Sequence, residues 1–547
     1  MTDLGTLYLL LPEALLLAAA TIIYLMGAFF PKHFRPNMVA GGAILIAAAV
    51  VFYQDGRALP LHGIAPWISG PITHDVFGHT ARWAILLFGL LFVMLSSHSK
   101  TVRPAAEYVG SLLLIVAGLM LVAAGYDLVV LFLGLELISI PTYVVLYLGR
   151  RDASGQEATA KYFFLSILSS ALLLYGFSFL YGLAGSTRLD HLFERLSEAS
   201  QLQEGAASMY GKLAPVAMLL VFAGLGFRMT AVPFHFYAPD VYQGTNHPNA
   251  GLLSTLPKIA GLLVLVRVVM VSMPGGELQG LGWRVALVMA VLTMTLGNVL
   301  ALWQDNIRRL LAYSSIAHGG YMLIGVAVGF ATTAAGTSPA RVGINGVGTA
   351  LFYLAVYCLA TIGAFASLKY LGSQDRQVDG VDELAGLGRT RPLAALALAI
   401  SMFSLAGVPP LAGFWGKLTL FTGALEVGGT GGSLGMWFVA LAIIGVLNAA
   451  IAMAYYLRIV AVMYFRSPVT TAKAEGGPGA WLAMVACALL VLAVGLDWGP
   501  ALNAADQAGR TVQQFQPRDT DKDVRIPVSL SGEPLPLEKT ASPSLPR

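Results

Sequence analysis

The number of long apolar runs constrains this chain more than any other feature. A helix that crosses a bilayer needs about 20 apolar residues. Fourteen such runs are present, roughly at 5–29, 37–53, 82–98, 107–125, 127–148, 160–183, 211–238, 249–273, 283–303, 308–332, 344–370, 392–424, 434–465 and 479–497. Charged residues make up only 11% of the 547 residues, whereas soluble domains contain about 25%. The sequence therefore predicts an all-α polytopic membrane protein with about fourteen transmembrane helices.

Composition also limits the cofactors that the chain can hold. Its two cysteines, Cys358 and Cys487, lie in apolar runs, so we expect neither a disulfide framework nor a metal cluster. No glycine-rich nucleotide loop precedes a helix, and no His, Cys or carboxylate cluster has ligand spacing. We therefore expect no cofactor on this chain. The net charge of +4 gives no indication of nucleic-acid binding.

The runs suggest a division of the chain. We expect an N-terminal three-helix segment at 1–106, helices 4–8 at 107–273, helices 9–13 at 283–465, a last helix at 479–497, and a polar, Pro-rich and disordered tail at 500–547. The charged segment 188–204 is amphipathic and predicts a surface helix. With the N-terminus outside, sixteen Lys and Arg fall in inside loops and seven in outside loops, the tail excluded. This bias predicts that both termini lie outside.

Two of the apolar runs contain a proline break. Gly224–Ile259 reads GLGFRMTAVPFHFYAPDVYQGTNHPNAGLLSTLPKI and carries Arg228, Pro233 and Lys258 at membrane depth. A charge at the bilayer centre costs at least ~2.5–3.5 kcal/mol, and a proline breaks the helical hydrogen-bond ladder. Broken helices with buried charges are tolerated where they line a polar path. We therefore interpret this stretch as part of an ion or proton route.

The second break reveals an internal repeat. The seventh run reads FRMTAVP at 227–233, and the twelfth reads FSLAGVP at 403–409, an offset of 176 residues. The two breaks lie five helices apart, an odd number, so they cross the membrane in opposite directions. The pattern predicts two inverted five-helix repeats, an arrangement typical of transporters whose functional groups lie near the midplane.

Five residues at membrane depth are the candidates for chemistry, namely Glu136, Arg228, Lys258, His318 and Lys417. Burial disfavours the charged form of a lysine, so a buried lysine can alternate between two protonation states. Histidine does so with little adjustment. A carboxylate beside a cation stays ionised and supports the cation's charge. Because an unpaired carboxylate at this depth is costly, we expect Glu136 to lie close to Arg228 or Lys258. An arginine holds a charge in place but does not release a proton.

Other interpretations of these and nearby residues remain open from the sequence alone. Glu136 can form a static ion pair, and His318 can be a core histidine bonded to Ser314 or Ser315. His235 and Asp240 can feed protons into the broken helix or cap its end. We assign no function to two further charges: Arg267, which we expect to extend to the outer interface, and Glu13, which we expect at the interface itself.

Several motifs carry a resemblance to a known family. GFRMTAVPFHFYAPDVYQG with STLPKIA, LELISIPTYVVLYLGR, QDNIRRLLAYSSIAHGGYMLIG and VPPLAGFWGKL resemble the antiporter-like subunit N of bacterial respiratory complex I, the counterpart of mitochondrial NADH dehydrogenase subunit 2. The resemblance covers about residues 100–465 and includes the count of fourteen helices. The resemblance places the family's glutamate at Glu136 and its histidine at His318. It places the family's first and second lysines at Lys258 and Lys417.

The resemblance implies a proton-translocating subunit of a NADH:quinone oxidoreductase in the bacterial inner membrane. It places NADH, flavin (FMN), iron–sulfur clusters and quinone on partner subunits, and it implies neighbouring antiporter-like subunits as partners. The family usually has lysine where this chain has Arg228, so release of a proton by that group is in doubt. The alternatives are a subunit of a multi-subunit cation/proton antiporter and a structural membrane scaffold.

Overall fold

The computed structural model describes residues 2–30, 34–62, 67–96, 105–201, 206–271, 277–334, 345–372, 377–468 and 474–513. The chain divides into two units, Met1–Gln514 and Phe515–Arg547, and all of the described residues belong to the first. The described part is almost entirely helical, as the sequence predicts. The predicted tail from residue 514 onward lies outside the described residues.

The N-terminal segment combines helices with one small hairpin. Its elements are α1 (Thr2–Leu9), α2 (Leu11–Phe29), α3 (Pro36–His62), β1 (Trp67–Ser69), β2 (Ile72–His74) and α4 (Val76–Ser96). The antiparallel hairpin pairs Ile68 with Thr73, and its turn uses Gly70 at φ +59°, a conformation that glycine adopts without strain. The hairpin is a short addition to the predicted all-α fold.

The first half of the core follows. It comprises α5 (Ala105–Ala124), α6 (Leu128–Gly149), α7 (Ala153–Ala184), α8 (Leu189–Gln201), α9 (Ala206–Arg228), α10 (Ala238–Gly244), α11 (His247–Leu265) and the π-helix η1 (Val266–Val271). Side chains define several starts, because Asp127, Asp152 and Asn246 each accept a hydrogen bond from a backbone N–H in the first turn. α8 confirms the predicted surface helix.

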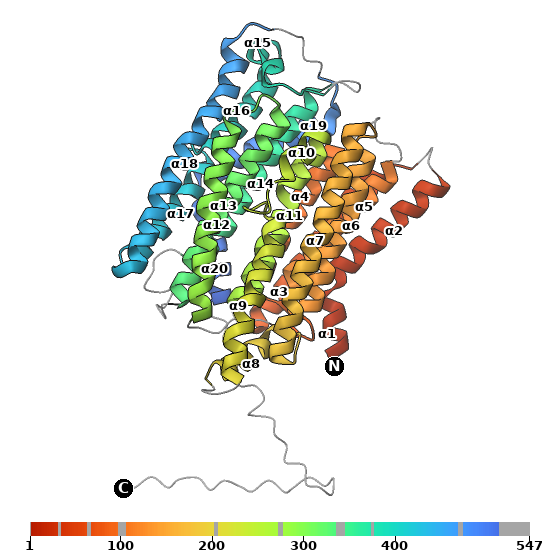
Figure 1. The fold of residues 1–547 in the computed structure, drawn as a ribbon. Helices are drawn as coiled ribbons and strands as arrows, with labels where there is room; N and C mark the ends of the chain where they lie inside the picture. Colours follow the sequence, from red (N-terminus) through yellow and green to blue (C-terminus); the bar gives the residue numbers. More distant parts are fainter. Residues whose placement is uncertain are drawn as a thin grey trace, which may run out of the picture. The chain divides into compact units, whose positions relative to one another are not determined.

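The second half contains α12 (Glu277–Ala301), α13 (Ile307–Ala334), α14 (Gly346–Tyr370), the 3₁₀ helix η2 (Val381–Leu384), α15 (Leu387–Thr390), α16 (Pro392–Ala406), α17 (Ala412–Gly428), α18 (Gly432–Phe465), α19 (Gly477–Leu496) and α20 (Gly499–Gln513). In Figure 1, α11, α13 and α14 lie in the middle of the bundle, with α2 and α18 on opposite sides. Every residue of α11 is buried.

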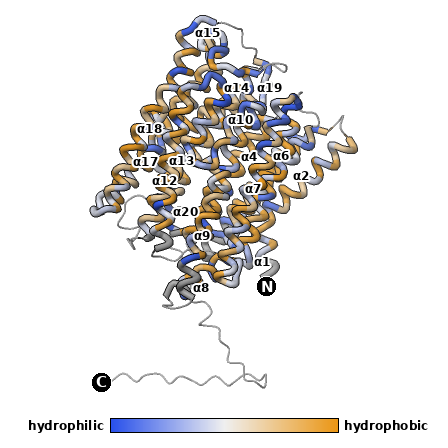
Figure 2. The backbone as a smooth tube through the Cα atoms, in the orientation of Figure 1, coloured by the Kyte–Doolittle hydropathy of each residue, from blue (hydrophilic) through white to orange (hydrophobic). Residues whose placement is uncertain are grey.

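Twelve helices of the described residues are long and apolar enough to cross a membrane. The two other predicted spans correspond to the broken helices, α9 with the segment after it and α16 with α17, so the count of fourteen stays a prediction. Figure 2 shows hydrophobic residues along the long helices and hydrophilic ones around α10 and α15 at one end. Both cysteines are free and buried.

Glycines let the core helices approach each other closely. A Cβ added to Gly297 on α12 would lie 2.6 Å from the backbone N of Ala317 on α13, and one added to Gly320 would lie 2.5 Å from the N of Met294. Both distances are too short for a side chain. Because lipid supplies no hydrophobic force between helices, small residues at such crossings provide the packing contacts.

The prediction of disorder from residue 500 is wrong for its first part. Residues 499–513 form α20, which packs against α14 and α4. Ala505, Ala508 and Val512 are buried along one face, and a Cβ on Gly348 of α14 would lie 2.7 Å from the Cα of Asp506. The average polarity of the segment conceals this apolar face, which is sufficient to dock a helix.

Candidate functional site

The first proline break lies where the sequence predicts it. α9 ends at Arg228, and helical structure resumes only at Ala238. The broken segment is fixed by two hydrogen bonds, from the Val232 N–H to Thr293 Oγ1 at 2.9 Å and from the Tyr237 hydroxyl to the Phe227 carbonyl at 3.0 Å. Thr230 has φ +54°. Such a value is a strained outlier for a β-branched residue, and such strain concentrates at functional sites.

Glu136 and Arg228 form an ion pair beside this break. The Arg228 Nη2 lies 3.4 Å from Glu136 Oε1. Two serines complete the cluster, because Ser170 Oγ donates to Glu136 Oε1 at 2.5 Å and Arg228 Nη1 donates to Ser139 Oγ at 2.9 Å. The Arg228 side chain is only 4% exposed, while that of Glu136 is 25% exposed. Glu136 therefore lies near Arg228, as we expected of a carboxylate at this depth.

Lys258 lies on α11 across from the same break. It is fully buried, and its Nζ donates to Thr230 Oγ1 at 2.5 Å. A Cβ on Gly261, one turn along α11, would lie 3.3 Å from the Arg228 Cβ, which places α11 against the end of α9. Among the described residues no carboxylate pairs with Lys258. Its positive form is therefore held by a neutral hydroxyl.

The second break ends α16 and precedes α17. Gly407 adopts φ +88° after α16, and this left-handed geometry suits glycine at a helix C-terminus. Lys417 of α17 reaches back to this end, where its Nζ donates to the carbonyls of Leu405 at 2.8 Å and Ala406 at 2.9 Å. The same Nζ lies 5.1 Å from the centre of the Tyr321 ring. The second lysine thus interacts with a helix terminus and an aromatic ring.

His318 lies on α13 in a cage of tyrosines. Its Nδ1 is 2.6 Å from the Tyr353 hydroxyl, and its Nε2 is 2.9 Å from the Tyr456 hydroxyl. The ring of Tyr357 is 4.8 Å away between centroids. Ser314 bonds to Tyr456, so tyrosines rather than serines satisfy the imidazole. The side chain is buried and fully partnered, and both of its nitrogens contact groups that can exchange a proton.

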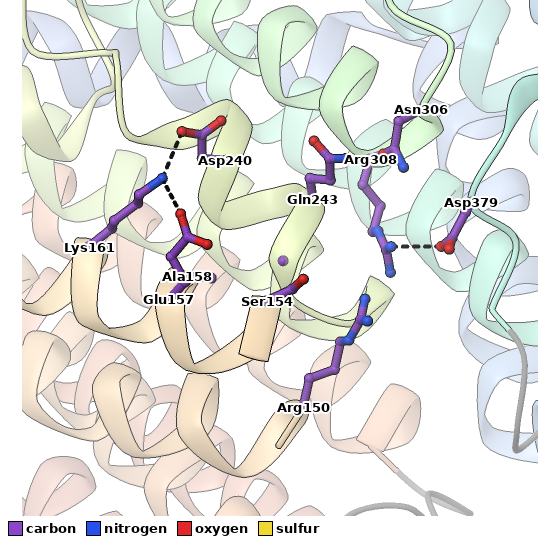
Figure 3. Close-up of a pocket in the computed structure, with 11 residues that line it drawn as sticks. Arg150, Ser154, Glu157, Ala158, Lys161, Asp240, Gln243, Asn306, Arg308 and Asp379 are labelled. Atoms are coloured by element: carbon purple, nitrogen blue, oxygen red, sulfur yellow. Dashed lines mark hydrogen bonds and ion pairs between the residues drawn. The ribbon is translucent and has the colours of Figure 1, made fainter. Parts of the chain in front are cut away.

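A polar cavity opens at one end of the first repeat. It has a volume of about 490 Å³ and is lined by Arg150, Ser154, Glu157, Ala158, Lys161, Asp240, Gln243, Gly244, Asn306, Arg308 and Asp379. Figure 3 shows the guanidinium groups of Arg150 and Arg308 pointing into the same part of it. The lining comes from α7, α10 and α13 and from three connecting segments, so the cavity lies where the first and second halves of the core meet.

Asp240 ties helices together at this cavity. Its Oδ2 lies 3.1 Å from Lys161 Nζ, and its Oδ1 lies 2.8 Å from Arg309 Nη1. Partial burial alone would raise the pKa of the Asp240 carboxyl, but the bonds and charges of Lys161 and Arg309 outweigh this and hold the pKa below its usual range. This geometry favours a structural tie over proton feeding. His235 lies half-buried in the break, and its Nδ1 has no partner among the described residues.

Two buried ion pairs were not found from the sequence. Arg267, expected to extend to the interface, is 1% exposed and pairs with Asp75 at 2.8 and 2.9 Å. Glu13, expected at the interface, is buried and pairs with Arg82 at 2.5 Å. Both expectations are wrong. The partners lie 192 and 69 residues apart in sequence, and patterns in the local sequence do not reveal such distant pairs.

Comparison with known proteins places this geometry in a family. The family described as NADH:quinone oxidoreductase/Mrp antiporter, TM matches residues 125–447. The chain is similar to the NADH-quinone oxidoreductase subunit N of Paramagnetospirillum magneticum, with 39% identity over 74% of this chain and 78% of that protein. It is also similar to the subunit N of Rhizorhabdus wittichii, with 36% identity over 93% and 99%.

Solved structures agree with these relatives. A chain of respiratory complex I from Thermus thermophilus with bound aureothin matches with a TM-score of 0.71 and 31% identity, over 91% of this chain and 99% of that one. A chain of the Mrp complex from a Dietzia species matches with a TM-score of 0.76 and 20% identity, over 92% and 98%. At this identity the second match concerns the fold alone.

Proposed function

The chain belongs to the NADH-quinone oxidoreductase subunit N family, and we propose that it is a proton-translocating membrane subunit of that enzyme. NADH oxidation and quinone reduction take place on partner subunits, which hold the flavin, the iron–sulfur clusters and the quinone site. The chain is a multi-pass membrane protein. In our proposal it lies in a bacterial inner membrane with both termini outside, as the distribution of Lys and Arg supports.

The observation that carries this proposal is the pair of buried lysines at the two helix breaks. Lys258 and Lys417 are both buried at proline-broken helices, and His318 lies between them, with electrostatic interactions to each. Lysines in such surroundings exchange protons, because burial opposes their charged form and a local polar group supports it. Static helix packing alone does not require three titratable groups aligned through the core.

Arg228 sets the electrostatics of the first lysine. Its guanidinium cannot release a proton, so in our proposal it acts as a fixed charge. With Glu136 ionised and close, the field of Arg228 at Lys258 is partly cancelled. When Glu136 moves away or is neutralised, that field increases and favours release of a proton from Lys258. Glu136 is the more exposed member of the pair, so a neighbouring antiporter-like subunit is a suitable source of the change.

A preparation of the native assembly tests this function. The chain should co-purify with subunits that oxidise NADH, and the assembly in sealed vesicles should acidify one side when NADH and a quinone are supplied. Co-purification with only small antiporter subunits, together with cation-driven proton movement, would instead assign the chain to a cation/proton antiporter. Normal pumping by variants that lack both Lys258 and Lys417 would make the chain a scaffold.

A further inference from the structure

One face of α11 joins the polar cavity to Lys258. His247, Gly251, Ser254 and Lys258 recur at intervals of four, three and four residues, so they share one face of the helix. All four are buried. With a rise of about 1.5 Å per residue, His247 lies about 16 Å along the helix from Lys258. The face therefore runs from the end of the bundle that holds the cavity to its centre.

His247 is the unexplained group on this face. Its side chain is 1% exposed. The imidazole interacts with the backbone of Val378, but neither ring nitrogen makes a hydrogen bond of normal geometry among the described residues. The Phe365 ring of α14 lies 6.5 Å away between centroids and packs along the same face. Buried polar side chains normally have a partner. An imidazole that has no well-formed hydrogen bond therefore indicates a site for transient water or proton exchange.

The surroundings of His247 place it directly behind the wall of the cavity. Gly244, three residues earlier, lines the cavity, and the Asn246 amide donates to the carbonyl of Gly149 at 3.3 Å. The charged groups that act on His247 are Arg150, Arg308 and Lys369. Arginines do not exchange protons, and Asp240 and Glu157 are held in ion pairs. His247 is thus the group at this wall best suited to pass a proton.

Hydroxyl groups continue the route beyond His247. The Tyr242 hydroxyl is buried and interacts with the side chains of Ser254 and Ser315. The Tyr357 hydroxyl lies 2.9 Å from Ser315 Oγ and 3.1 Å from the Ser254 carbonyl oxygen. Tyr357 also contacts His318. These groups lie between His247, Lys258 and His318.

We propose that His247 is the proton-uptake residue of this chain, receiving protons from the polar cavity and passing them through the Ser254, Ser315 and Tyr357 hydroxyls toward Lys258. A proton from cavity water binds one ring nitrogen, and the other nitrogen releases its proton toward the hydroxyls. The imidazole then returns to its first tautomer, so no charge stays beside Arg150, Arg308 and Lys369. This inference rests on the proposed function.

The test uses the intact assembly in sealed vesicles with NADH as the driving substrate. We expect His247→Gln to lower the rate of proton uptake about tenfold, less than the roughly 10²–10⁴-fold of a group acting in a transition state, because cavity water partly replaces a relay. His247→Ala should regain most of the lost rate when imidazole is added on the cavity side. His191→Gln, on the exposed surface of α8, should match the parent protein.

The outcomes separate this inference from the proposed function. If His247→Gln pumps within twofold of the parent protein while Lys258→Ala does not pump, the uptake role is wrong and the proposed function stands. If His247→Ala assembles and pumps slowly but imidazole restores nothing, the residue is structural and the inference also fails. A slow His247→Gln with recovery of His247→Ala by imidazole supports it, since packing defects do not respond to imidazole.

Discussion

The two helix breaks stabilise a buried lysine in different ways. At the first, Lys258 donates to the hydroxyl of Thr230, and the nearby charge of Arg228 is balanced by Glu136. At the second, Lys417 donates to the last carbonyls of α16, which carry the negative end of the helix dipole. The first break therefore uses side chains, and the second uses backbone and an aromatic ring.

This difference gives the two breaks different roles, control of a proton at the first and storage of a proton at the second. A carboxylate can move, protonate or respond to a neighbouring subunit, and Glu136 is 25% exposed. Backbone carbonyls at a helix end keep their position and charge. We infer that the first break is where coupling acts on the proton, and that the second holds a proton in a nearly constant field until His318 exchanges with it.

The largest expected effect is loss of either lysine. Lys258→Ala and Lys417→Ala should each abolish most proton pumping, because each removes the protonatable group at its break, while assembly persists. The measurement is the rate of acidification per NADH oxidised in sealed vesicles, with subunit content checked on a native gel. Pumping near the parent rate by one assembled variant would show that only the other lysine is functional, so the two breaks would not be equivalent.

Loss of Arg228 should have the next largest effect. Arg228→Ala leaves Glu136 in low dielectric without its cation, so the carboxylate tends to protonate. A hydrogen bond to a charged group contributes about 1.5–3 kcal/mol, and we expect pumping to fall about tenfold or more. Arg228→Lys keeps a cation and should retain pumping. The two variants are compared in vesicles, and an Arg228→Ala variant that pumps like the parent would make this break structural only.

Sequence reasoning found the breaks, the charges and one ion pair, but it missed the other partners of these groups. Pro233 and Pro409 lie within apolar runs, so proline chemistry alone located both breaks. The proximity of Glu136 to Arg228 followed from the cost of an unpaired charge. Tyr353 and Tyr456, which hold His318, have no such signal, since a tyrosine in an apolar helix reads as ordinary core.

Long-range pairing and one-sided helices also escaped prediction. Nothing local to Arg267 indicates Asp75, because their contact depends on where η1 packs against the residue that precedes α4. The assignment of α20 to a disordered tail relied on average polarity, whereas docking depends on the side that carries Ala508. In both cases tertiary packing decides between interpretations that are locally equivalent.

A smaller effect is expected at the hydroxyl that holds Lys258. Thr230→Val keeps the side-chain shape and removes Oγ1, so the protonated lysine loses its partner. The loss of one hydrogen bond, about 0.5–1.5 kcal/mol, predicts a several-fold decrease in pumping. Thr230→Ser keeps the hydroxyl and should stay near the parent rate. Equal rates for Val and Ser variants would show that Lys258 needs no local acceptor, unlike Lys417.

The smallest effect is expected where the two repeats meet, at Asp240. Its carboxyl has a lowered pKa and bridges Lys161 of the first repeat and Arg309 of the second. A depressed carboxyl pKa adds stability above the unfolded value of about 3.9, and this contribution is lost as pH falls through the folded pKa. The side chain is 40% exposed, so solvent screening limits the pair to about 1 kcal/mol or less.

Asp240→Asn should therefore lower the melting temperature of the assembly slightly at pH 7, with the difference from the parent disappearing below about pH 4. Pumping should stay within twofold, because a tie between helices carries no proton. A variant that is stable but does not pump would show that Asp240 supplies protons to the broken helix, and the control of the first break would then begin at the cavity rather than at Glu136.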